Sequence, residues 1–235
     1  MFDKTARYYD ALYSWKDYPA EAQRVVDFVR QYKASPGNAL LDVACGTGKH
    51  MEALQESFAV TGLDLDPGLL EIARERYPAL QFVAADMRSF ELPQRFDVVT
   101  CLFSSIGYLT TIQAVRDTFD TFANHLHAGG VALIEPWIFP DQFEPGNIHR
   151  LTPDDSDGVS LCRMATTRRD GDRVQLEMHY LIGTADGIEH LRETHHTMMY
   201  PREVLQEQLQ QAGFDVTWDE EGLMGRGLFI GVRRS

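Results

Sequence analysis

The stretch that decides the fold is LLDVACGTGKH, residues 40–50. A short apolar run ends at Asp42, and Gly46 and Gly48 follow before the pattern becomes helical. A strand that runs through a glycine-bearing turn into a helix brings bare backbone close to a ligand, because glycine has no Cβ to keep the ligand away. The stretch therefore predicts a ligand-binding loop at the carboxyl end of a buried strand.

Three classes of ligand compete for this loop. A phosphate-binding loop needs G-x-x-x-x-G-K-[ST], but Val43 stands in place of the first glycine and His50 follows Lys49. A dinucleotide loop needs G-x-G-x-x-G, and Met51 at the third glycine position disfavours a pyrophosphate. The third class is a ligand without phosphates in the loop, whose amino-acid and ribose parts lie against the glycine backbone.

Two further acids extend the pattern along the chain. The next apolar run ends in GLDLD, where Asp64 can accept hydrogen bonds from both hydroxyls of a ribose. A third run ends in AADMRSF, where Asp86 can accept from an adenine amino group and Met87 can pack against the ring. Because the carboxyl ends of successive parallel strands meet at one edge of a sheet, these residues predict one nucleoside-bearing ligand across that edge.

Strands and helices alternate along the first part of the chain. Helical spacing is found at 19–38, 49–58, 67–78 and 111–126. Short strand-like runs are found at 39–44, 59–66, 80–86, 96–103 and, after a turn at 127–130, at 131–137. Such alternation predicts a parallel sheet that helices cover on both faces.

The pattern changes after Trp137. Three extended segments at 159–169, 174–183 and 188–200 are joined by the turn sequences RDGD and TADG, which predicts an antiparallel meander. A helix at 201–214 and strands at 215–220 and 227–234 then close the chain. The expected fold class is α/β, with a doubly wound, mostly parallel seven-stranded sheet and a small antiparallel β-insertion before the last helix. The expected division is 1–136 for the ligand-binding core with its N-terminal helices, 137–199 for the insertion and 200–235 for the last helix and two closing strands.

Composition narrows the class of partner. Twenty-two basic and 35 acidic residues give a net charge of −13, which argues against a nucleic-acid substrate, since phosphate backbones are bound by clustered Lys and Arg. The three cysteines, Cys45, Cys101 and Cys162, have no C-x-x-C spacing and indicate free thiols in a reducing compartment. No apolar stretch has the length of a signal peptide or of a membrane span. We therefore expect a cytoplasmic protein that binds neither nucleic acid nor membrane.

The loop and the two strand-end acids resemble the cofactor site of the class I S-adenosylmethionine-dependent methyltransferases. The resemblance implies a Rossmann-like fold that binds S-adenosyl-L-methionine and releases S-adenosyl-L-homocysteine, without a metal. Asp42 would lie near the methionine part, Asp64 would hold the ribose, and Asp86 with Met87 would contact adenine. Many members carry glycine where this chain has Ala44. The full set expected to contact the cofactor is Tyr18, Asp42, Ala44, Gly46, Gly48, Asp64, Leu65, Asp86, Met87 and Phe103.

A second resemblance covers nearly the whole chain. KDY, LLDVACGTGKH, DMRSF, FSSIGYL, GGVALIEPWIFP, the meander and GRGLFIG occur in the same order as in the N,N-dimethyltransferases of nucleotide-linked amino sugars, which make the dimethylamino sugars of macrolide antibiotics. The resemblance implies that the acceptor is a 3- or 4-amino-deoxysugar linked to thymidine diphosphate, methylated twice on its amine. The [DNS]-P-P-[YF] motif of many methyltransferases that act on amide or ring nitrogens is absent.

The second resemblance also implies roles for individual residues. Tyr18 would contact the methionine end of the cofactor, and Arg226, between two glycines, would face the diphosphate. Tyr108 stands where a relative has a histidine beside the sugar amine, and is our candidate to accept a proton or orient the nitrogen lone pair. Tyr13 and His179 are the reserve candidates for that role.

Further expectations concern the acceptor side. Ser105, Glu135 and Trp137 join Tyr108 and Arg226 as residues expected to bind the substrate. His195 and His196 are adjacent on an expected strand, so their side chains point to opposite faces and do not share a metal ion. They are interpreted, with His190, as structural or surface residues.

Two other functions are compatible with the same motifs. One keeps the fold and cofactor but methylates another small-molecule amine or hydroxyl. The other is a non-catalytic protein that binds the cofactor for regulation. The expected assembly is a monomer or a homodimer.

Overall fold

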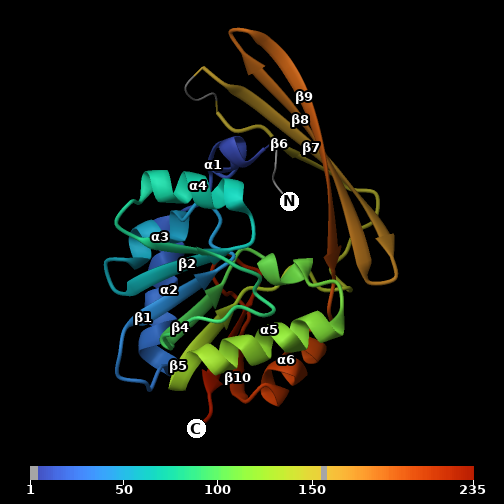
Figure 1. Cartoon of the computed structure of the whole chain (residues 1–235). Helices are drawn as coiled ribbons and strands as arrows, with labels where there is room; N and C mark the ends of the chain where they lie inside the picture. Colours follow the sequence, from blue (N-terminus) through green and yellow to red (C-terminus); the bar gives the residue numbers. More distant parts are fainter. Residues whose placement is uncertain (1–4, 155–157) are drawn as a thin grey trace.

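Strands and helices alternate along the first part of the chain, as the sequence predicts (Figure 1). The computed structural model describes residues 5–154 and 158–235. The helices are η1 (Ala6–Tyr8), α1 (Tyr9–Leu12), α2 (Tyr18–Tyr32), α3 (Lys49–Leu54), α4 (Pro67–Arg76), η2 (Ser105–Tyr108), α5 (Ile112–His125) and α6 (Arg202–Gln211). The strands are β1 (Ala39–Val43), β2 (Ala59–Asp64), β3 (Gln81–Ala84), β4 (Phe96–Cys101), β5 (Leu126–Ile134), β6 (Ile148–Leu151), β7 (Ser160–Asp170), β8 (Arg173–Thr184), β9 (Gly187–Met198), β10 (Phe214–Asp219) and β11 (Leu228–Arg233).

The larger sheet has seven strands in the order β10-β11-β5-β4-β1-β2-β3. Strand β1 lies between β2 and β4 and is parallel to both, whereas β11 is antiparallel to its neighbours β5 and β10. The chain runs outward from β1 to β3 and then returns to β4 on the other side of β1. The carboxyl end of β1 is therefore the topological switch point, where ligands bind in such sheets. The doubly wound, mostly parallel sheet of the sequence prediction is confirmed.

Two groups of helices cover the two faces of this sheet. On one face α5 and α6 pack over an apolar cluster that includes Leu41 and Phe119, and on the other α2, α3 and α4 pack over a cluster that includes Leu40 and Val29. Successive residues Leu40 and Leu41 belong to opposite clusters because side chains alternate along a strand. Burial on both faces explains why the strands read as continuous apolar runs in the sequence.

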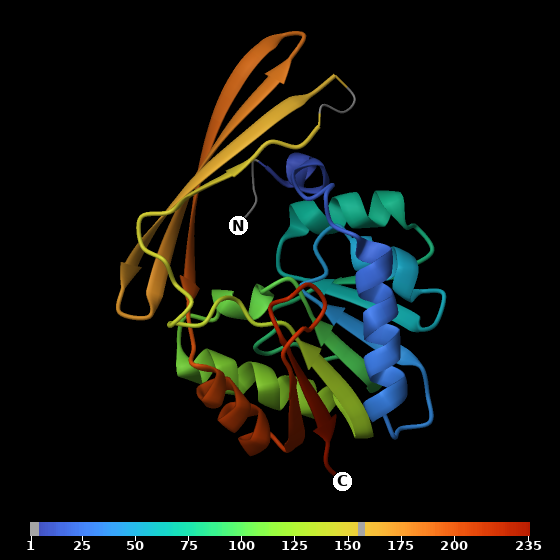
Figure 2. The ribbon, with the colours of Figure 1, turned by 180° about the vertical axis from the view of Figure 1, so that it is seen from behind.

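The insertion forms a separate sheet in the order β6-β7-β8-β9, with every neighbouring pair antiparallel. Figures 1 and 2 show it standing over one end of the core, with α1 between the two sheets. The meander of β7, β8 and β9 was predicted, but β6 was not. Ile148, His149 and Arg150 of β6 are exposed, and so short a solvated strand carries no alternation for a sequence pattern to detect.

The expected turn at residues 127–130 is wrong, because these residues belong to β5. Gly129 adopts a left-handed backbone with φ of +75°, and the pairing of β4 with β5 shifts register between Phe96 and Val98. The backbone N–H groups of Ala34 and Ser35 both donate to the carbonyl of Gly129. Two glycines that look like a turn thus form an irregular part of a strand.

The N-terminal helices pack under the insertion and not against the core helices alone. Tyr8 and Leu12 share an apolar cluster with Leu161, Tyr180 and Leu191 of the insertion. This contact closes one side of the space above the switch point. In the described part of the chain, no helix combines the length and apolarity that crossing a bilayer requires.

Candidate active site

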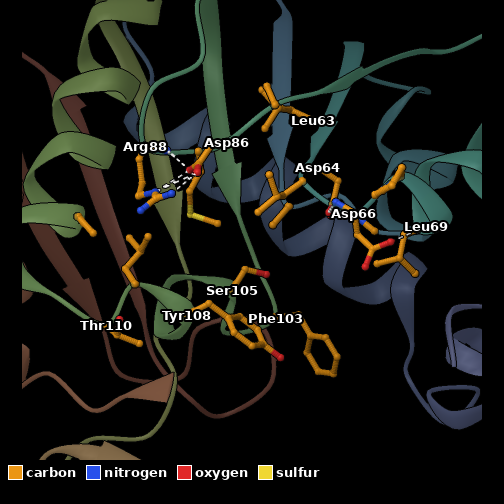
Figure 3. A pocket seen from close by; sticks show the side chains of 18 of the residues that line it. Leu63, Asp64, Asp66, Leu69, Asp86, Arg88, Phe103, Ser105, Tyr108 and Thr110 are labelled. Atoms are coloured by element: carbon orange, nitrogen blue, oxygen red, sulfur yellow. Dashed lines mark hydrogen bonds and ion pairs between the residues drawn. The ribbon is translucent and has the colours of Figure 1, made fainter. Parts of the chain in front are cut away.

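A cavity of about 500 Å³ lies at the carboxyl ends of the central strands, beneath the N-terminal helices (Figure 3). A smaller cavity of about 40 Å³ adjoins it and shares Tyr9, Ala44, Gly46, Phe103 and Ser105 with it. Of the residues predicted from the sequence, the larger cavity is lined by Tyr13, Ala44, Gly46, Asp64, Leu65, Asp86, Met87, Phe103, Ser105 and Tyr108, and the smaller one also by Tyr18 and Asp42. The fold thus collects residues of four strand ends into one continuous space.

Asp64 lies at the centre of this space, at the end of β2. One carboxylate oxygen accepts the backbone N–H of Gly46 at 2.8 Å, and the other accepts that of Asp66 at 2.8 Å. Burial raises the pKa of Asp64 above its ordinary value, and these two hydrogen bonds oppose the rise. Each oxygen keeps a second lone pair, so the carboxylate can still accept from the two hydroxyls of a ribose.

Asp42 lies at the closed end of the smaller cavity. Its side chain is buried, and Oδ1 accepts the hydroxyl of Thr100 at 2.7 Å. Burial raises the pKa of Asp42 to about 6, because removal from water disfavours the charged form. A cationic ligand group placed beside Asp42 would favour its charged form.

The glycine loop leaves its backbone open toward the cavity. Gly46 has φ of +56°, and a Cβ added there would meet no atom within 4 Å, so it would enter the space that a ligand needs. Ala44 has φ of +59°, a left-handed backbone that is unfavourable for a residue with a Cβ. Gly48, with φ of +79°, starts α3 and lies against Tyr77. Gly48 does not line either cavity, and its expected contact with the cofactor stays a prediction.

Asp86 lies at the far end of the larger cavity, with Met87 and Leu65. Both of its carboxylate oxygens bind the guanidinium of Arg88, which holds the pKa of Asp86 below its ordinary value (Figure 3). Leu65 is 58% exposed although it is apolar. An exposed apolar side chain in a cavity wall offers a surface on which a flat ring can pack. Arg88 was missed, since an arginine in a loop gives no sequence signal of its partner.

A strained turn after β4 forms the opposite wall of the cavity. Phe103 and Ser104 have φ of +52° and +67°, which costs non-glycine residues about 1–2 kcal/mol each. The buried carboxylate of Glu135 accepts the Phe103 N–H at 2.6 Å. The Ser104 hydroxyl donates to the carbonyl of Pro136 and accepts from the guanidinium of Arg226 at 2.9 Å. Residues from two distant segments, 135–136 and 226, therefore hold FSSIGYL in shape.

Tyr108 and Tyr13 stand on the same side of the cavity, and the insertion holds both of them. The hydroxyl of Tyr13 accepts from Arg163 of β7 at 2.8 Å. Tyr108 Oη lies 2.7 Å from Nδ1 of His195 on β9. Neither contact was predicted, because β7 and β9 lie far from these tyrosines in the sequence.

Other predicted residues are placed around the cavity and not in its lining. Glu135 and Arg226 lie behind the strained turn, and Trp137 packs against Gly107, so that a Cβ added to Gly107 would come within 3.1 Å of it. Oε1 of Glu135 is buried, and it has no hydrogen-bond partner among the described residues, 5–154 and 158–235.

His179 is not brought to the cavity, so the structure does not support its reserve role in catalysis. It lies on the outer face of β8, where its ring stacks on His190 at 5.1 Å and its Nε2 lies 3.1 Å from Glu177. The neighbouring residue, Tyr180, faces the N-terminal helices. Because successive side chains of a strand point to opposite faces, His179 lies on the face of β8 that points away from the N-terminal helices.

A buried polar cluster beneath the smaller cavity was missed as well. Lys16 donates to both oxygens of Glu21 at 2.7 and 2.9 Å, and His50 lies 2.8 Å from Glu21. Burial opposes the ionisation of Glu21, but these hydrogen bonds hold its pKa below the ordinary value. Lys16 also lies 4.0 Å from the centre of the Phe103 ring. The cluster fixes the KDY segment, and with it Tyr18, against the cavity.

Comparison with known proteins agrees with this geometry. A methyltransferase-domain family matches residues 40–130. The chain is 38% identical over 231 residues to the dTDP-3-amino-3,6-dideoxy-alpha-D-glucopyranose N,N-dimethyltransferase of Streptomyces fradiae, covering 97% of this chain and 90% of that protein.

Two solved structures are similar to the whole fold. DesVI of Streptomyces venezuelae superimposes with a TM-score of 0.91 at 36% identity, over 97% of this chain and 98% of that one. The S-adenosylmethionine-bound structure of CalS10, an amino pentose methyltransferase of Micromonospora echinaspora, gives a TM-score of 0.83 at 36% identity, over 93% and 92%. The chain therefore belongs to the family of S-adenosylmethionine-dependent methyltransferases that includes the N,N-dimethyltransferases of dTDP-linked amino sugars.

Proposed function

We propose that this enzyme methylates the amino group of an amino-deoxysugar linked to thymidine diphosphate. The observation that carries the proposal is the 38% identity over 97% of the chain with a relative named for that reaction. The insertion supports it, because a solved amino pentose methyltransferase matches 93% of this chain with a TM-score of 0.83. The net charge of −13 is compatible with this acceptor, because a single diphosphate requires only one or a few local cations.

The residues present fit S-adenosylmethionine along the two adjoining cavities. Leu65, Asp86 and Met87 would hold the adenine, Asp64 the ribose, and Asp42 the ammonium of the methionine moiety. When bound, S-adenosylmethionine supplies a methyl group on a positively charged sulfur. The open side of Gly46 supports this fit, since no protein atom fills the space beside it.

The acceptor would enter from the side of Tyr13, Ser105 and Tyr108. These residues line the same cavity as Asp64 but come from the N-terminal helix and from η2. Holding an amine nitrogen in line with the transferred group supplies much of the rate, because orientation is fixed before reaction. Tyr9 and Tyr13 of the N-terminal segment line the cavity, and exclusion of water on binding would favour a reaction that disperses charge.

Arg226 would neutralise part of the diphosphate, with Glu135, Trp137 and the strained turn around it. Arg226 is partly buried, and its guanidinium lies 5.6 Å from the centre of the Phe103 ring. An arginine fixed in this way loses little conformational freedom on binding an anion. We also propose that the enzyme works in the cytoplasm, where thiols such as Cys45 stay reduced.

The proposal is tested by calorimetric titration of thymidine diphosphate into protein saturated with S-adenosylhomocysteine. Binding at micromolar concentration, together with much weaker binding of free thymidine, is the expected result. Incubation with dTDP-linked 3-amino and 4-amino sugars should then give products heavier by one and two methyl groups in mass spectrometry. Binding of S-adenosylhomocysteine without binding or turnover of any nucleotide-linked sugar would contradict the proposal and favour another amine.

The Arg226→Ala variant sharpens this test. Loss of a charge-assisted contact should weaken thymidine diphosphate binding about 10-fold or more, while S-adenosylhomocysteine affinity stays within about twofold. Arg226→Lys keeps the charge and should recover part of the affinity. Arg95→Ala, which removes an exposed arginine elsewhere on the surface, is the matched control. An equal loss for both ligands in Arg226→Ala would show that Arg226 only supports the turn.

A further inference from the structure

His195 is buried, and its imidazole joins the lining of the cavity to the insertion. Its side chain is only 3% exposed, and its Nδ1 lies 2.7 Å from the hydroxyl of Tyr108. The adjacent His196 is exposed on the opposite face of β9. The prediction that this pair points to opposite faces is confirmed, whereas the contact of His195 with Tyr108 was not predicted. The contact with Tyr108 places His195 one side chain away from the cavity.

Glu193 lies on the other side of the same imidazole. Its Oε2 is 3.5 Å from His195 Nε2, and its position is fixed by hydrogen bonds from Thr5 at 2.7 Å and from Tyr180 at 3.3 Å. A lone pair on Nε2 would face a carboxylate at this position, which is unfavourable. Neutral His195 therefore carries its proton on Nε2 and presents the Nδ1 lone pair to Tyr108, since the hydrogen bond of one ring nitrogen sets the state of the other.

We propose that Tyr108, His195 and Glu193 form a proton relay that removes a proton from the protonated amine (ammonium) of the acceptor. This inference rests on the proposed function and adds residues to the same site. Tyr108 is the catalytic residue, because it alone of the three lines the cavity. His195 and Glu193 are positioning residues that act through it. The arrangement of carboxylate, imidazole and hydroxyl follows the logic by which a buried acid orients a histidine and stabilises its cation.

The proton balance of the relay is simple. The protonated amine (R–NH3+) passes a proton to Tyr108 Oη as the phenol proton passes to His195 Nδ1, and the electron pair of the broken N–H bond stays on nitrogen as its lone pair. The imidazole becomes an imidazolium whose Nε2–H faces the Glu193 carboxylate. The imidazolium returns the extra proton to water after the product leaves. Where two methyl groups are added, the first transfer leaves a methylated ammonium. This ammonium must lose a proton before the second transfer, so the relay also acts between the two transfers.

The charges that face His195 and Tyr108 agree with this direction of transfer. Burial raises the pKa of Tyr108, so the phenol is neutral and needs a base behind it. Burial opposes the ionisation of Glu193, but the close approach of His195 at 3.5 Å and the hydrogen bond from Thr5 hold its pKa below the ordinary value. Tyr13 and Tyr180 are further phenols near Tyr108, and Arg163 of β7 is a cation that faces it from the insertion.

The tautomer of His195 is the first test, because it requires no acceptor. Nitrogen NMR of the wild-type complex with S-adenosylhomocysteine should show the proton of neutral His195 on Nε2, with exposed His196 as the internal reference. A proton on Nδ1 overturns the relay whatever the acceptor is. Failure to methylate any amino sugar overturns the proposed function alone.

Kinetics of variants are the second test. Asn at position 195 keeps an oxygen near the place of Nδ1 but cannot carry a proton, so His195→Asn should lower kcat at neutral pH by about 100-fold. KM and thymidine diphosphate affinity should change less than threefold. The defect should shrink as pH rises, because the amine then arrives already neutral. His196→Asn, the matched control on the opposite face, should keep wild-type kinetics.

Two further variants separate a relay from a merely structural role. Tyr108→Phe/His195→Asn should be no slower than Tyr108→Phe, since His195 acts only through Tyr108. Glu193→Gln keeps the size of the side chain and should lower kcat with the same pH dependence. Losses that add in the double variant, or that stay equal at all pH values, overturn the relay.

Discussion

The two walls of the cavity are held in different ways. The nucleoside wall, formed by Gly46, Asp64, Leu65, Asp86 and Met87, is fixed by contacts between residues close in the sequence. Asp64 accepts from Gly46 and Asp66, and Asp86 binds Arg88.

The acceptor wall, formed by Tyr13, Phe103, Ser105 and Tyr108, depends on distant segments. Tyr13 is held by Arg163, Tyr108 by His195 and Phe103 by Glu135. The nucleoside wall is therefore set by strand-end sequence, whereas the acceptor wall is set by tertiary packing.

The largest expected effect concerns the nucleoside wall. Asp64→Asn should weaken S-adenosylhomocysteine binding by about 100-fold or more, because two hydroxyls lose a charged acceptor at about 1.5–3 kcal/mol each. Calorimetric titration measures this loss. Asp27→Asn, an exposed change on α2, is the control. An affinity within threefold of wild type would mean that Asp64 only orders the glycine loop.

The next largest effect is expected for a substitution that removes a support of the acceptor wall. Glu135→Ala removes a buried carboxylate that accepts the Phe103 N–H, and should destabilise the fold by about 2–3 kcal/mol. Urea denaturation measures the change, and kcat should fall further than S-adenosylhomocysteine affinity because the turn carries Tyr108. Glu135→Gln keeps an acceptor and should lose less. Equal losses of kcat and cofactor affinity would contradict the separation of the two walls.

A pH-dependent effect follows from Asp42 at the closed end. Its pKa of about 6 in the free protein means that a proton competes with a bound ammonium below that pH. The affinity for S-adenosylhomocysteine should therefore be full above pH 6 and fall by up to about tenfold per unit below it. Titrations from pH 5 to 8 measure the slope. Asp42→Asn should bind more weakly at pH 8 and lose the pH dependence, and an unchanged slope would assign it to another group.

The smallest effect tests the strain in the glycine loop. Ala44→Gly relieves a left-handed backbone worth about 1–2 kcal/mol, but the unfolded chain gains about 0.4–1 kcal/mol of flexibility. We expect a net gain near 0.5 kcal/mol in thermal denaturation, with cofactor affinity unchanged. Gly46→Ala, two residues away, should instead weaken cofactor binding because its Cβ enters the cavity. Loss of binding in Ala44→Gly would show that its methyl group contacts the cofactor.

The sequence predicted the seven-stranded fold, the antiparallel insertion and most of the nucleoside wall. Each of these depends on a local pattern: an apolar run before Asp42, the glycines after it, and acids such as Asp64 that end the following strands. Strand β6 and the irregular start of β5 were missed or wrong, because an exposed short strand and a pair of glycines look like loop in any local window.

By itself, the sequence determined which residues end the strands, and with them the family and the cofactor. Only the tertiary structure decided what stands behind Tyr108 and Tyr13, which face of β8 carries His179, and that Glu135 and Arg226 hold the strained turn. The physical reason is that strand periods and turn chemistry act over a few residues. The contacts of Tyr108 with His195 and of Tyr13 with Arg163 join positions 87 and 150 residues apart, and only the packing of the insertion over the N-terminal helices sets them.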